Sequence, residues 1–410
     1  MQTSTSTDRP KCLSSLSEKA LQVKDSITMA ITALAAQMTA EGTKVLSFSA
    51  GEPDFDTPQN IKQAGIDAIK AGKTKYTAAS GIIELKKAVC KKLKQDTGLT
   101  YGTENIVITC GAKHAIYNAF MAVLNPGDEV LIPTPYWVSY PDQAKLVGAV
   151  PILIETTDKA EFKITPEQLE KAITPKTKLL ILNSPSNPTG SIYTQAELED
   201  LAEVILKHQI MVLSDEIYEK LIYDGEKHIS IATLSPRLKA LTLLVDGVAK
   251  SHSMTGWRIG YIAAEAPIAK AMGQIQSHTT SNPTTPAQWA ALEALEGPQA
   301  TVQTMKKEFD KRRKVMVEGL NAIPGLTCLL PKGAFYTFPN VSSCYGKKSA
   351  SGLITDSVTF CANLLKEEHV ACVPGSGFGA DNHIRLSYAT SLSDIQEGIK
   401  KIAHFVSSLT

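Results

Sequence analysis

One lysine in the sequence stands where it could act as a nucleophile. Lys250 follows the apolar run Leu241–Val245 and lies in a turn of small residues. A lysine at the end of a buried strand loses hydration, so its amine can be neutral near physiological pH and can then attack a carbonyl. Arg258, framed by glycines, has the planar fork that binds a phosphate. A lysine for an aldehyde and an arginine for a phosphate together indicate pyridoxal 5′-phosphate (PLP).

Two further side chains suit the ring of that cofactor. Asp215 follows the apolar run Ile210–Ser214, and a carboxylate beside a pyridine nitrogen favours the protonated ring, which is a better electron sink. Tyr218 could bond the phenolate oxygen of the ring. Each residue also has an ordinary structural interpretation: a solvated strand end for Lys250, a helix N-cap for Asp215 and packing for Tyr218.

A proline-rich turn follows another apolar run. In the stretch Asn183–Gly190, Asn187 is a rigidly held amide that suits the same phenolate oxygen. The alternative is turn formation alone, because Asn-Pro and Thr-Gly are common turn formers. We predict that the peptide bond before Pro188 is cis.

Three other features could contact the cofactor or its substrate. Gly111, Ala112 and Lys113 begin a predicted helix whose free N–H groups would attract a phosphate, although many helices begin this way with nothing bound. Trp137 could stack on the ring or belong to the core. Arg385 lies between apolar neighbours, where a clamp on a substrate carboxylate or an internal ion pair would account for it.

Secondary-structure elements must position these residues. From about Lys70 to Ala300, short apolar runs typical of strands alternate with stretches of helical periodicity. This alternation predicts a mostly parallel α/β sheet. Polar residues that could do chemistry come directly after each of these strands. In open α/β sheets, ligands bind beyond the carboxyl ends of the strands. The site is therefore predicted along that edge. The candidate strands are Ile106–Thr109, Glu129–Pro133, Lys178–Leu182, Ile210–Ser214 and Leu241–Val245.

The pattern changes after this region. A long amphipathic helix is predicted from Val302, and it leads to a C-terminal α+β domain over Gly325–Thr410. That domain is expected to contain strands at Ala334–Phe338 and His383–Leu386 and a closing helix at Leu392–Leu409.

Composition excludes several classes of protein. The 410 residues carry 42 basic and 41 acidic side chains, so no global charge favours nucleic acid or an anionic membrane. No apolar run approaches the length of a membrane-spanning helix. The seven cysteines form no metal-ligand spacing, and we expect free thiols, no metal and a cytoplasmic protein. The Ser/Thr-rich N-terminus, residues 1–18, is expected to be disordered or loosely attached.

Taken together, these stretches resemble the class I aminotransferases of PLP fold type I, and among them the bacterial aspartate aminotransferases, a subgroup that includes aspartate/prephenate enzymes. The resemblance runs from about Lys19 to the end of the chain. It implies an N-terminal arm and part of a small domain over 19–62, a large PLP-binding domain over 63–301, and a linker helix with the rest of the small domain over 302–410. The matching stretches are Ser49–Phe55, Asn187–Gly190, Asp215 with Tyr218, Lys250 with Met254–Arg258, and Arg385.

The resemblance implies a role for each ring-facing residue. Lys250 would bind PLP covalently and then carry the proton between the substrate Cα and the cofactor. Asp215 would keep the ring nitrogen protonated, while Asn187 and Tyr218 would bond the phenolate oxygen.

It implies roles at the two charged ends as well. Arg258 and the backbone of residues 111–113 would bind the phosphate, and Tyr76 would reach the phosphate of a partner subunit, which implies a homodimer with shared sites. The α-carboxylate of the substrate would be held by Arg385 together with Gly51, Asn187 and Trp137.

Two departures concern the subgroup. Many members have serines where this chain has Ala249 and Gly247, although bacterial enzymes with Ala-Ala-Lys exist. The partner arginine that animal-type enzymes use for the distal carboxylate has no evident counterpart. Lys113, with Ser26 and Thr28, resembles the bacterial alternative, and a lysine with hydroxyls favours a dicarboxylic substrate. An exposed first-turn lysine is the alternative for Lys113.

The expected function is therefore ping-pong transfer of an amino group between L-aspartate and 2-oxoglutarate. Prephenate aminotransferase activity stays open, as does an aromatic or branched-chain transaminase, which would not need Lys113. A PLP lyase, such as a carbon–sulfur β-lyase or an aminocyclopropane carboxylate synthase, shares the lysine, aspartate and arginine. A transcription factor with an aminotransferase-like domain would need a DNA-binding domain ahead of Lys19, for which the sequence has no room.

Overall fold

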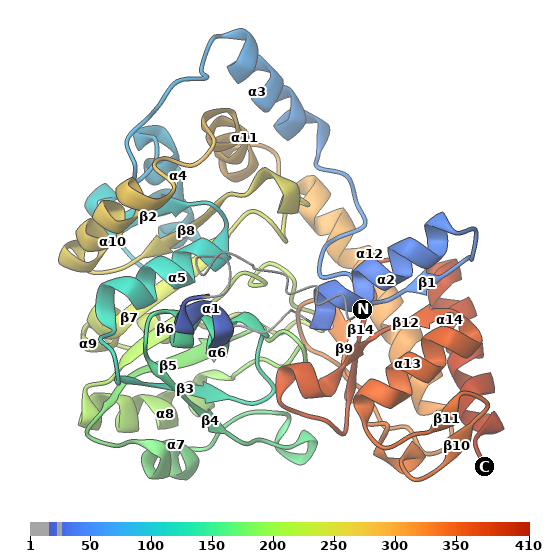
Figure 1. Ribbon diagram of the computed structural model, residues 1–410. Helices are drawn as coiled ribbons and strands as arrows, with labels where there is room; N and C mark the ends of the chain where they lie inside the picture. The colour runs from blue at the N-terminus through green and yellow to red at the C-terminus, as the bar shows by residue number, and fades with distance from the viewer. Residues whose placement is uncertain (1–15, 23–26) are drawn as a thin grey trace, which may run out of the picture.

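The structure is a computed structural model that describes residues 16–22 and 27–410. In this part of the chain the central sheet has seven strands in the order β2-β8-β7-β6-β5-β3-β4 (Figure 1). The strands are β2 (Ile106–Thr109), β3 (Glu129–Pro133), β4 (Val150–Ile154), β5 (Thr177–Asn183), β6 (Met211–Asp215), β7 (Thr242–Gly247) and β8 (Gly260–Ala263). The predicted mostly parallel α/β sheet is confirmed.

The direction of β8 brings two distant segments to the same edge. This strand pairs antiparallel with both β2 and β7, whereas the other neighbouring strands are parallel. The carboxyl ends of β2, β3, β5, β6 and β7 therefore share one edge, and the start of β8 lies there too. Arg258 directly precedes β8, so it reaches the edge at which Lys250 leaves β7.

The inner strands of the sheet are buried on both faces, and successive side chains of a strand point to opposite sides. Val130 and Ile132 of β3 pack with α5 and α10 on one face, whereas Leu131 between them packs with α8 on the other. The strands are accordingly near-continuous apolar runs. The helices of this region are α3 (Gln59–Lys70), α4 (Ile83–Thr97), α5 (Ala112–Val123), α6 (Ser139–Leu146), α7 (Pro166–Ala172), α8 (Gln195–His208), α9 (Pro236–Leu241), α10 (Ala266–Thr279) and α11 (Thr285–Glu296).

The long helix α12 (Ala300–Asn321) leads to a second group of elements, drawn in orange and red in Figure 1. A three-stranded antiparallel sheet has the order β13-β14-β9, and β1 of the N-terminal region pairs with β12. The remaining elements are α1 (Glu18–Gln22), α2 (Ile27–Ala40), β1 (Leu46–Ser47), β9 (Tyr336–Thr337), β10 (Lys348–Ser349), β11 (Gly352–Leu353), α13 (Ser357–Glu368), β12 (Val370–Ala371), β13 (Val373–Pro374), β14 (Ile384–Ser387) and α14 (Leu392–Ser408).

Two strands of the central sheet were not predicted from the sequence. Strand β4 is an edge strand that contains Pro151 and is partly exposed, so it lacks the continuous apolar signature of its neighbours. Strand β8 is only four residues long and starts with a glycine. The predicted strand Ala334–Phe338 was too long: Ala334 has a positive φ of 59°, and only Tyr336–Thr337 pairs as a strand.

Two expectations from composition can be compared with the described residues. No helix there is long and apolar enough to cross a bilayer. The cysteines described are free thiols, while Cys12 and most of the N-terminal stretch 1–18 lie outside the described residues.

Candidate active site

Lys250 lies just beyond β7, and its amine points into the protein. The Nζ atom donates a hydrogen bond to the carbonyl of Gly51 and lies 5.8 Å from the ring centroid of Tyr218. Burial, reinforced by the nearby positive charge of Arg385, lowers the pKa of Lys250 to about 8. The amine is therefore far closer to its neutral, nucleophilic form than an exposed lysine would be.

Asp215 is the last residue of β6 and is buried, with 4% of its surface exposed. The Tyr140 hydroxyl donates to its Oδ2 atom at 2.7 Å, and the Ile217 amide donates to its Oδ1 atom at 3.3 Å. Burial raises the pKa of Asp215 to about 6, against the opposing effect of the Tyr140 hydrogen bond. Asp215 makes no ion pair with any side chain that the structure describes, so this carboxylate suits a cationic ligand atom.

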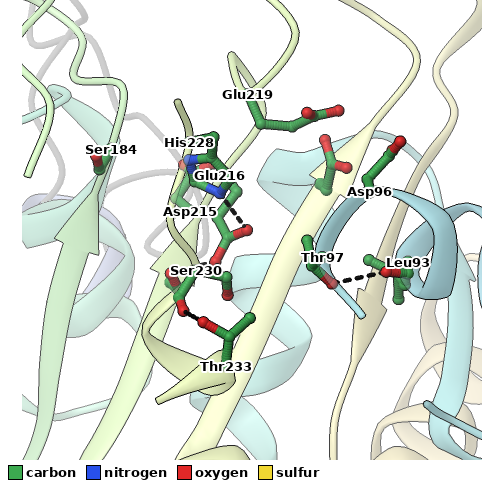
Figure 2. Close-up of polar contacts among 12 residues, drawn as sticks. Leu93, Asp96, Thr97, Ser184, Asp215, Glu216, Glu219, His228, Ser230 and Thr233 are labelled. Atoms are coloured by element: carbon green, nitrogen blue, oxygen red, sulfur yellow. Dashed lines mark hydrogen bonds and ion pairs between the residues drawn. The ribbon is translucent and has the colours of Figure 1, made fainter. Parts of the chain in front are cut away.

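Figure 2 shows that the neighbouring carboxylate, Glu216, is satisfied by protein groups. Its oxygens accept from Ser214 Oγ at 2.7 Å and Ser230 Oγ at 2.6 Å, and His228 Nε2 lies 2.7 Å away. The His228 and serine contacts outweigh burial and lower the pKa of Glu216. Glu216 therefore anchors the chain directly after Asp215 and leaves Asp215 as the carboxylate available to a ligand.

Replacing Tyr140 with phenylalanine should raise the pKa of Asp215 further. The hydrogen bond favours the ionised carboxylate, and a bond to a charged group is worth roughly 1.5–3 kcal/mol, so the midpoint should move upward by about one to two pH units. The titration can be followed by NMR in cofactor-free protein labelled with ¹³C-aspartate, with Asp215→Asn to assign the signal. Tyr193→Phe removes a buried hydroxyl that bonds the Ile164 amide instead, and it should leave the midpoint unchanged. A midpoint that stays at the wild-type value in Tyr140→Phe would contradict the assignment.

Arg385 on β14 is a buried cation with no acidic partner among the described residues. Its Nη1 atom donates to Asn187 Oδ1 at 3.1 Å and its Nη2 atom donates to the Ser49 carbonyl at 2.8 Å, while Nε has no hydrogen-bond partner. The guanidinium lies 4.6 Å from the ring centroid of Tyr336. The ion-pair alternative from the sequence is thus not realised in the described residues, and the full positive charge is available to a carboxylate.

Asn187 and Tyr218 lie beside these two cations. The peptide bond between Asn187 and Pro188 is cis, as predicted, and the backbone N–H of Asn187 donates to Asn183 Oδ1 at 2.8 Å. The Tyr218 hydroxyl lies 2.9 Å from that of Tyr336, and both rings are buried. The turn and the paired tyrosines hold polar atoms rigidly between Lys250 and Arg385.

A compact cradle forms where β2 and β8 meet. Gly111 has a φ of +86°, and a Cβ atom there would collide with the Arg258 guanidinium. A Cβ atom on Gly260 would collide with the backbone nitrogen of Ala112. The Arg258 guanidinium donates to the carbonyls of Thr255 and Cys110 at 2.9 and 3.2 Å. Its remaining donors and the first amides of α5 suit an anion such as a phosphate.

The other predicted site residues are distributed as follows. The Lys113 Nζ atom lies 5.0 Å from the Trp137 ring centroid, and desolvation together with the charge of Arg258 lowers the pKa of Lys113. Tyr76 is 89% exposed on the surface of the single chain. Ser26 lies outside the described residues; Thr28 lies in α2, but its side chain is likewise outside them.

The whole chain can be compared with known proteins. Residues 43–402 match the family model for aminotransferase class I and II. The chain belongs to the class I and II aminotransferases. Among this family it is 51% identical over 391 residues to the aspartate aminotransferase of Bacillus sp. (strain YM-2), covering 95% of this chain and 99% of that protein. It is 49% identical over 397 residues to the aspartate/prephenate aminotransferase of Cereibacter sphaeroides, covering 96% and 99%.

Solved aminotransferase structures have the same fold. The aspartate aminotransferase of Rhizobium meliloti superimposes with a TM-score of 0.93 at 45% identity, covering 97% of this chain and 100% of that one. The Thermus thermophilus aspartate aminotransferase with maleate has a TM-score of 0.90 at 40% identity, covering 95% and 99%. The family and PLP fold type I, both expected from the sequence, are thereby confirmed.

Tyr140 and Tyr336 of this candidate site were not singled out from the sequence, and Ser49 was named only as the start of a matching stretch. Tyr140 bonds Asp215, Tyr336 bonds Tyr218, and the carbonyl of Ser49 bonds Arg385. Nothing in the sequence around Tyr140 and Tyr336 distinguishes them from tyrosines that only pack in a core. The contact of Ser49 uses its backbone carbonyl, which every residue type has. Their partners are far away in the sequence, so only the folded chain reveals them.

Proposed function

We propose that the chain is an aspartate aminotransferase that transfers an amino group between L-aspartate and 2-oxoglutarate in a ping-pong cycle with PLP. The observation that carries the proposal is one site that holds a partly buried amine with a lowered pKa, Lys250, and a buried arginine, Arg385, with no acidic partner among the described residues. An amine for the cofactor and a guanidinium for the substrate carboxylate are the two groups that this reaction needs.

The donor set of the site fits PLP. The buried carboxylate of Asp215 would face the ring nitrogen, the Tyr218 hydroxyl and the Asn187 amide would face the phenolate oxygen, and Arg258 with the Gly111–Lys113 backbone would bind the phosphate. Two glycines allow the close packing of this cradle, since a Cβ atom at Gly111 would collide with the Arg258 guanidinium and one at Gly260 with the backbone of Ala112. When bound, PLP supplies an electron sink that stabilises negative charge at the substrate Cα.

In the proposed cycle Lys250 has two tasks. Its amine would hold the cofactor covalently, and when free it would take the proton from the substrate Cα and pass it to the cofactor. A base works best when its pKa is close to the working pH, and the pKa of about 8 meets that condition. The ionised carboxylate of Asp215, which accepts a hydrogen bond from Tyr140, would keep the ring nitrogen protonated.

Arg385 would orient the substrate for this proton transfer. Its two terminal nitrogens are held in position by Asn187 and by the Ser49 carbonyl, so the planar fork is presented with little loss of side-chain entropy on binding. We propose that Gly51, whose carbonyl contacts Lys250, and Trp137, whose ring lies beside Lys113, line the same carboxylate subsite.

We propose that Lys113 selects a second carboxylate on the substrate. Its ammonium lies over Trp137, beside the expected substrate position, and Ser26 and Thr28 are its proposed companions. The names of the two curated relatives above include aspartate, and the Thermus thermophilus structure contains maleate, which is also a dicarboxylate.

Replacing Lys113 with alanine should lower kcat/KM for aspartate about tenfold and leave kcat/KM for phenylalanine nearly unchanged. The reason is that an ion pair in a partly desolvated site is worth on the order of 1–2 kcal/mol, while phenylalanine has no distal charge. Steady-state kinetics with both amino donors gives the ratio. Lys91→Ala, at an exposed position on α4, is the matched control. An equal loss for both donors would mean that Lys113 serves the cofactor rather than the distal carboxylate.

The proposed function is tested by the products formed from five amino donors: aspartate, glutamate, tyrosine, phenylalanine and cysteine. With ¹⁵N-labelled donors and 2-oxoglutarate or oxaloacetate as acceptor, mass spectrometry should find the label in the acceptor, with aspartate and glutamate preferred. Transfer only from the aromatic pair would point to an aromatic enzyme. Release of pyruvate, sulfide and ammonia from cysteine without transfer would point to a carbon–sulfur lyase.

Prephenate is the second candidate acceptor. The relative from Cereibacter sphaeroides, which is 49% identical, carries aspartate/prephenate in its name. Prephenate has a keto acid end for Arg385 and a second carboxylate for Lys113. Formation of ¹⁵N-labelled arogenate from labelled aspartate or glutamate would establish this activity, and its absence at millimolar prephenate would exclude it.

We also propose a homodimer in which Tyr76 reaches the phosphate end of the partner's site. A tyrosine that is 89% exposed on one chain is an unusual surface residue, and burial against a second chain would account for it. Sedimentation equilibrium should give twice the chain mass. A monomer that retains full transaminase activity would contradict the shared site.

A further inference from the structure

A second cavity lies away from the catalytic groups, between the loop after β4 and the C-terminal elements. It is open to solvent on one side and has a volume of about 290 Å³, close to the lower end of ligand pockets. Its floor is aromatic: Phe162, Phe338 and His383 contact one another with ring centroids 4.9 to 5.7 Å apart. The rest of the wall is Asp158, Lys159, Asn321, Thr327, Cys328 and Leu329.

His383 is the unusual group in this cavity. Only 7% of its surface is exposed, and neither ring nitrogen has a hydrogen-bond partner among the described residues. Its ring stacks on Phe338 with an interplanar angle of 5°, so the ring edge and not its face can make polar contacts. Buried polar atoms are normally bonded, and each exception calls for an explanation. A ligand bound in the cavity would explain this exception, because it would supply the missing hydrogen-bond partner.

Asp158 stands across a gap from this histidine. Its Oδ1 atom accepts from the Lys159 amide at 2.8 Å, whereas Oδ2 lies 4.0 Å from His383 Nε2, too far for a hydrogen bond. One hydroxyl group between them can donate to the carboxylate and accept from the imidazole. Burial lowers the pKa of His383, which keeps the ring neutral and able to donate through one nitrogen.

The loop that carries Asp158 and Phe162 has a strained backbone. Glu161 and Phe162 are consecutive non-glycine residues with positive φ, 50° and 57°. For a bulky residue this conformation is uncommon, and such strain concentrates at ligand-contacting segments. Here it places the Phe162 ring edge-on to His383.

We propose that this cavity binds a monocyclic aromatic compound that carries a hydroxyl group. The ring would pack on Phe162 and Phe338, whose edges and faces favour another aromatic ring, and the hydroxyl would bridge Asp158 and His383. A carboxylate at that position would be repelled by Asp158. The cavity volume suits one ring with small substituents rather than a nucleotide.

Occupancy of the cavity is expected to affect the substrate site through β14. His383 directly precedes β14, and Arg385 is the second residue of that strand. Asp158 and Phe162 belong to the chain between β4 and α7, so the bridging hydroxyl would tie that segment to the arginine strand. Arg385 itself is already held by Asn187 and Ser49, so the expected gain comes from fixing the segment between β4 and α7 against the arginine strand, which should tighten binding of a dicarboxylate.

The test uses the full-length, PLP-loaded protein and p-cresol, which has neither an amino group nor a carboxylate for the catalytic site. Isothermal titration calorimetry should find one p-cresol per chain, and toluene, which lacks the hydroxyl, should bind about tenfold more weakly. His383→Phe keeps an aromatic ring on Phe338 but removes both nitrogens, and it should weaken p-cresol about tenfold.

A pair of tryptophan variants distinguishes binding in this cavity from binding at other apolar sites. Leu329→Trp fills the cavity mouth and should abolish binding, whereas Leu330→Trp adds the same side chain at a neighbouring position outside the lining and should change the affinity less than about twofold. Both leucines are similarly exposed, at 43% and 45%, so both variants should fold. Unchanged p-cresol binding in Leu329→Trp, or no binding to the wild type, would overturn the proposal and leave the cavity to water.

The link to Arg385 has its own measurement. Saturating p-cresol should tighten succinate, an unreactive dicarboxylate, about fivefold in the wild type and not in Leu329→Trp. Succinate affinity that does not respond to p-cresol would overturn the link but not the cavity site. Because neither titration needs turnover, failure here is distinguishable from failure of the proposed transaminase function.

Discussion

Replacing Lys250 with alanine is expected to lower the rate of amino transfer by at least about 10⁴-fold, because the chain loses both its nucleophile and its proton carrier. No other lysine side chain is placed to contact the Gly51 carbonyl in the described structure. The rate of ¹⁵N transfer from aspartate to 2-oxoglutarate measures this loss. Mass spectrometry after borohydride reduction should also find the PLP adduct on Lys250 in the wild type and no adduct in the variant.

A matched control is Lys270→Ala, at an exposed position on α10. It should retain both the rate and the adduct. A Lys250→Ala protein that transfers nitrogen at the wild-type rate would refute the assignment of the nucleophile. Loss of the rate with a PLP adduct at another lysine would instead place the reactive amine elsewhere in the site.

The second large effect is expected for Arg385→Lys. A lysine keeps the positive charge but loses the planar fork, and it cannot replace both bonds, one to Asn187 and one to the Ser49 carbonyl. Losing one charge-assisted hydrogen bond to a carboxylate costs roughly 1.5–3 kcal/mol, so affinity for succinate should fall about 10- to 150-fold. Calorimetry on the PLP-loaded protein measures this affinity directly.

Two observations keep the Arg385 result interpretable. The PLP adduct should form normally, because Arg385 is not expected to contact the cofactor. Arg237→Lys, at an exposed position on α9, should bind succinate as the wild type does. Equal succinate affinity in Arg385→Lys and in the wild type would show that the clamp lies on another residue.

The two groups differ in how each reaches its place. Lys250 follows a strand of the central sheet, where burial lowers its pKa. Arg385 comes from a separate sheet, and it meets Asn187 and Ser49 although 198 and 336 residues separate it from them. A strand end can be predicted from local sequence, but a contact over such a separation depends on how the two sheets are placed.

Local pattern was sufficient for several features. Continuous apolar runs located β2 and β3 at their observed bounds, and β5, β6 and β7 within about two residues, because strands buried on both faces need apolar side chains at every position. The cis bond at Pro188 was predicted from the proline-rich turn. The edge strand β4 and the short β8 escaped prediction, since neither carries that signature.

The amino-acid sequence by itself determined the fold class, the family and the residue types that meet at the carboxyl edge of the sheet. Tertiary structure decided how those residues are paired. It turned β8 antiparallel and so brought Arg258 to the shared edge. It placed Tyr140 on Asp215, and it left His383 beside a cavity with no hydrogen-bond partner among the described residues. Apolar periodicity and turn residues act over a few positions, so sequence reveals them. Pairing of polar groups depends on distances between segments far apart in the chain, and packing of the whole molecule sets those distances.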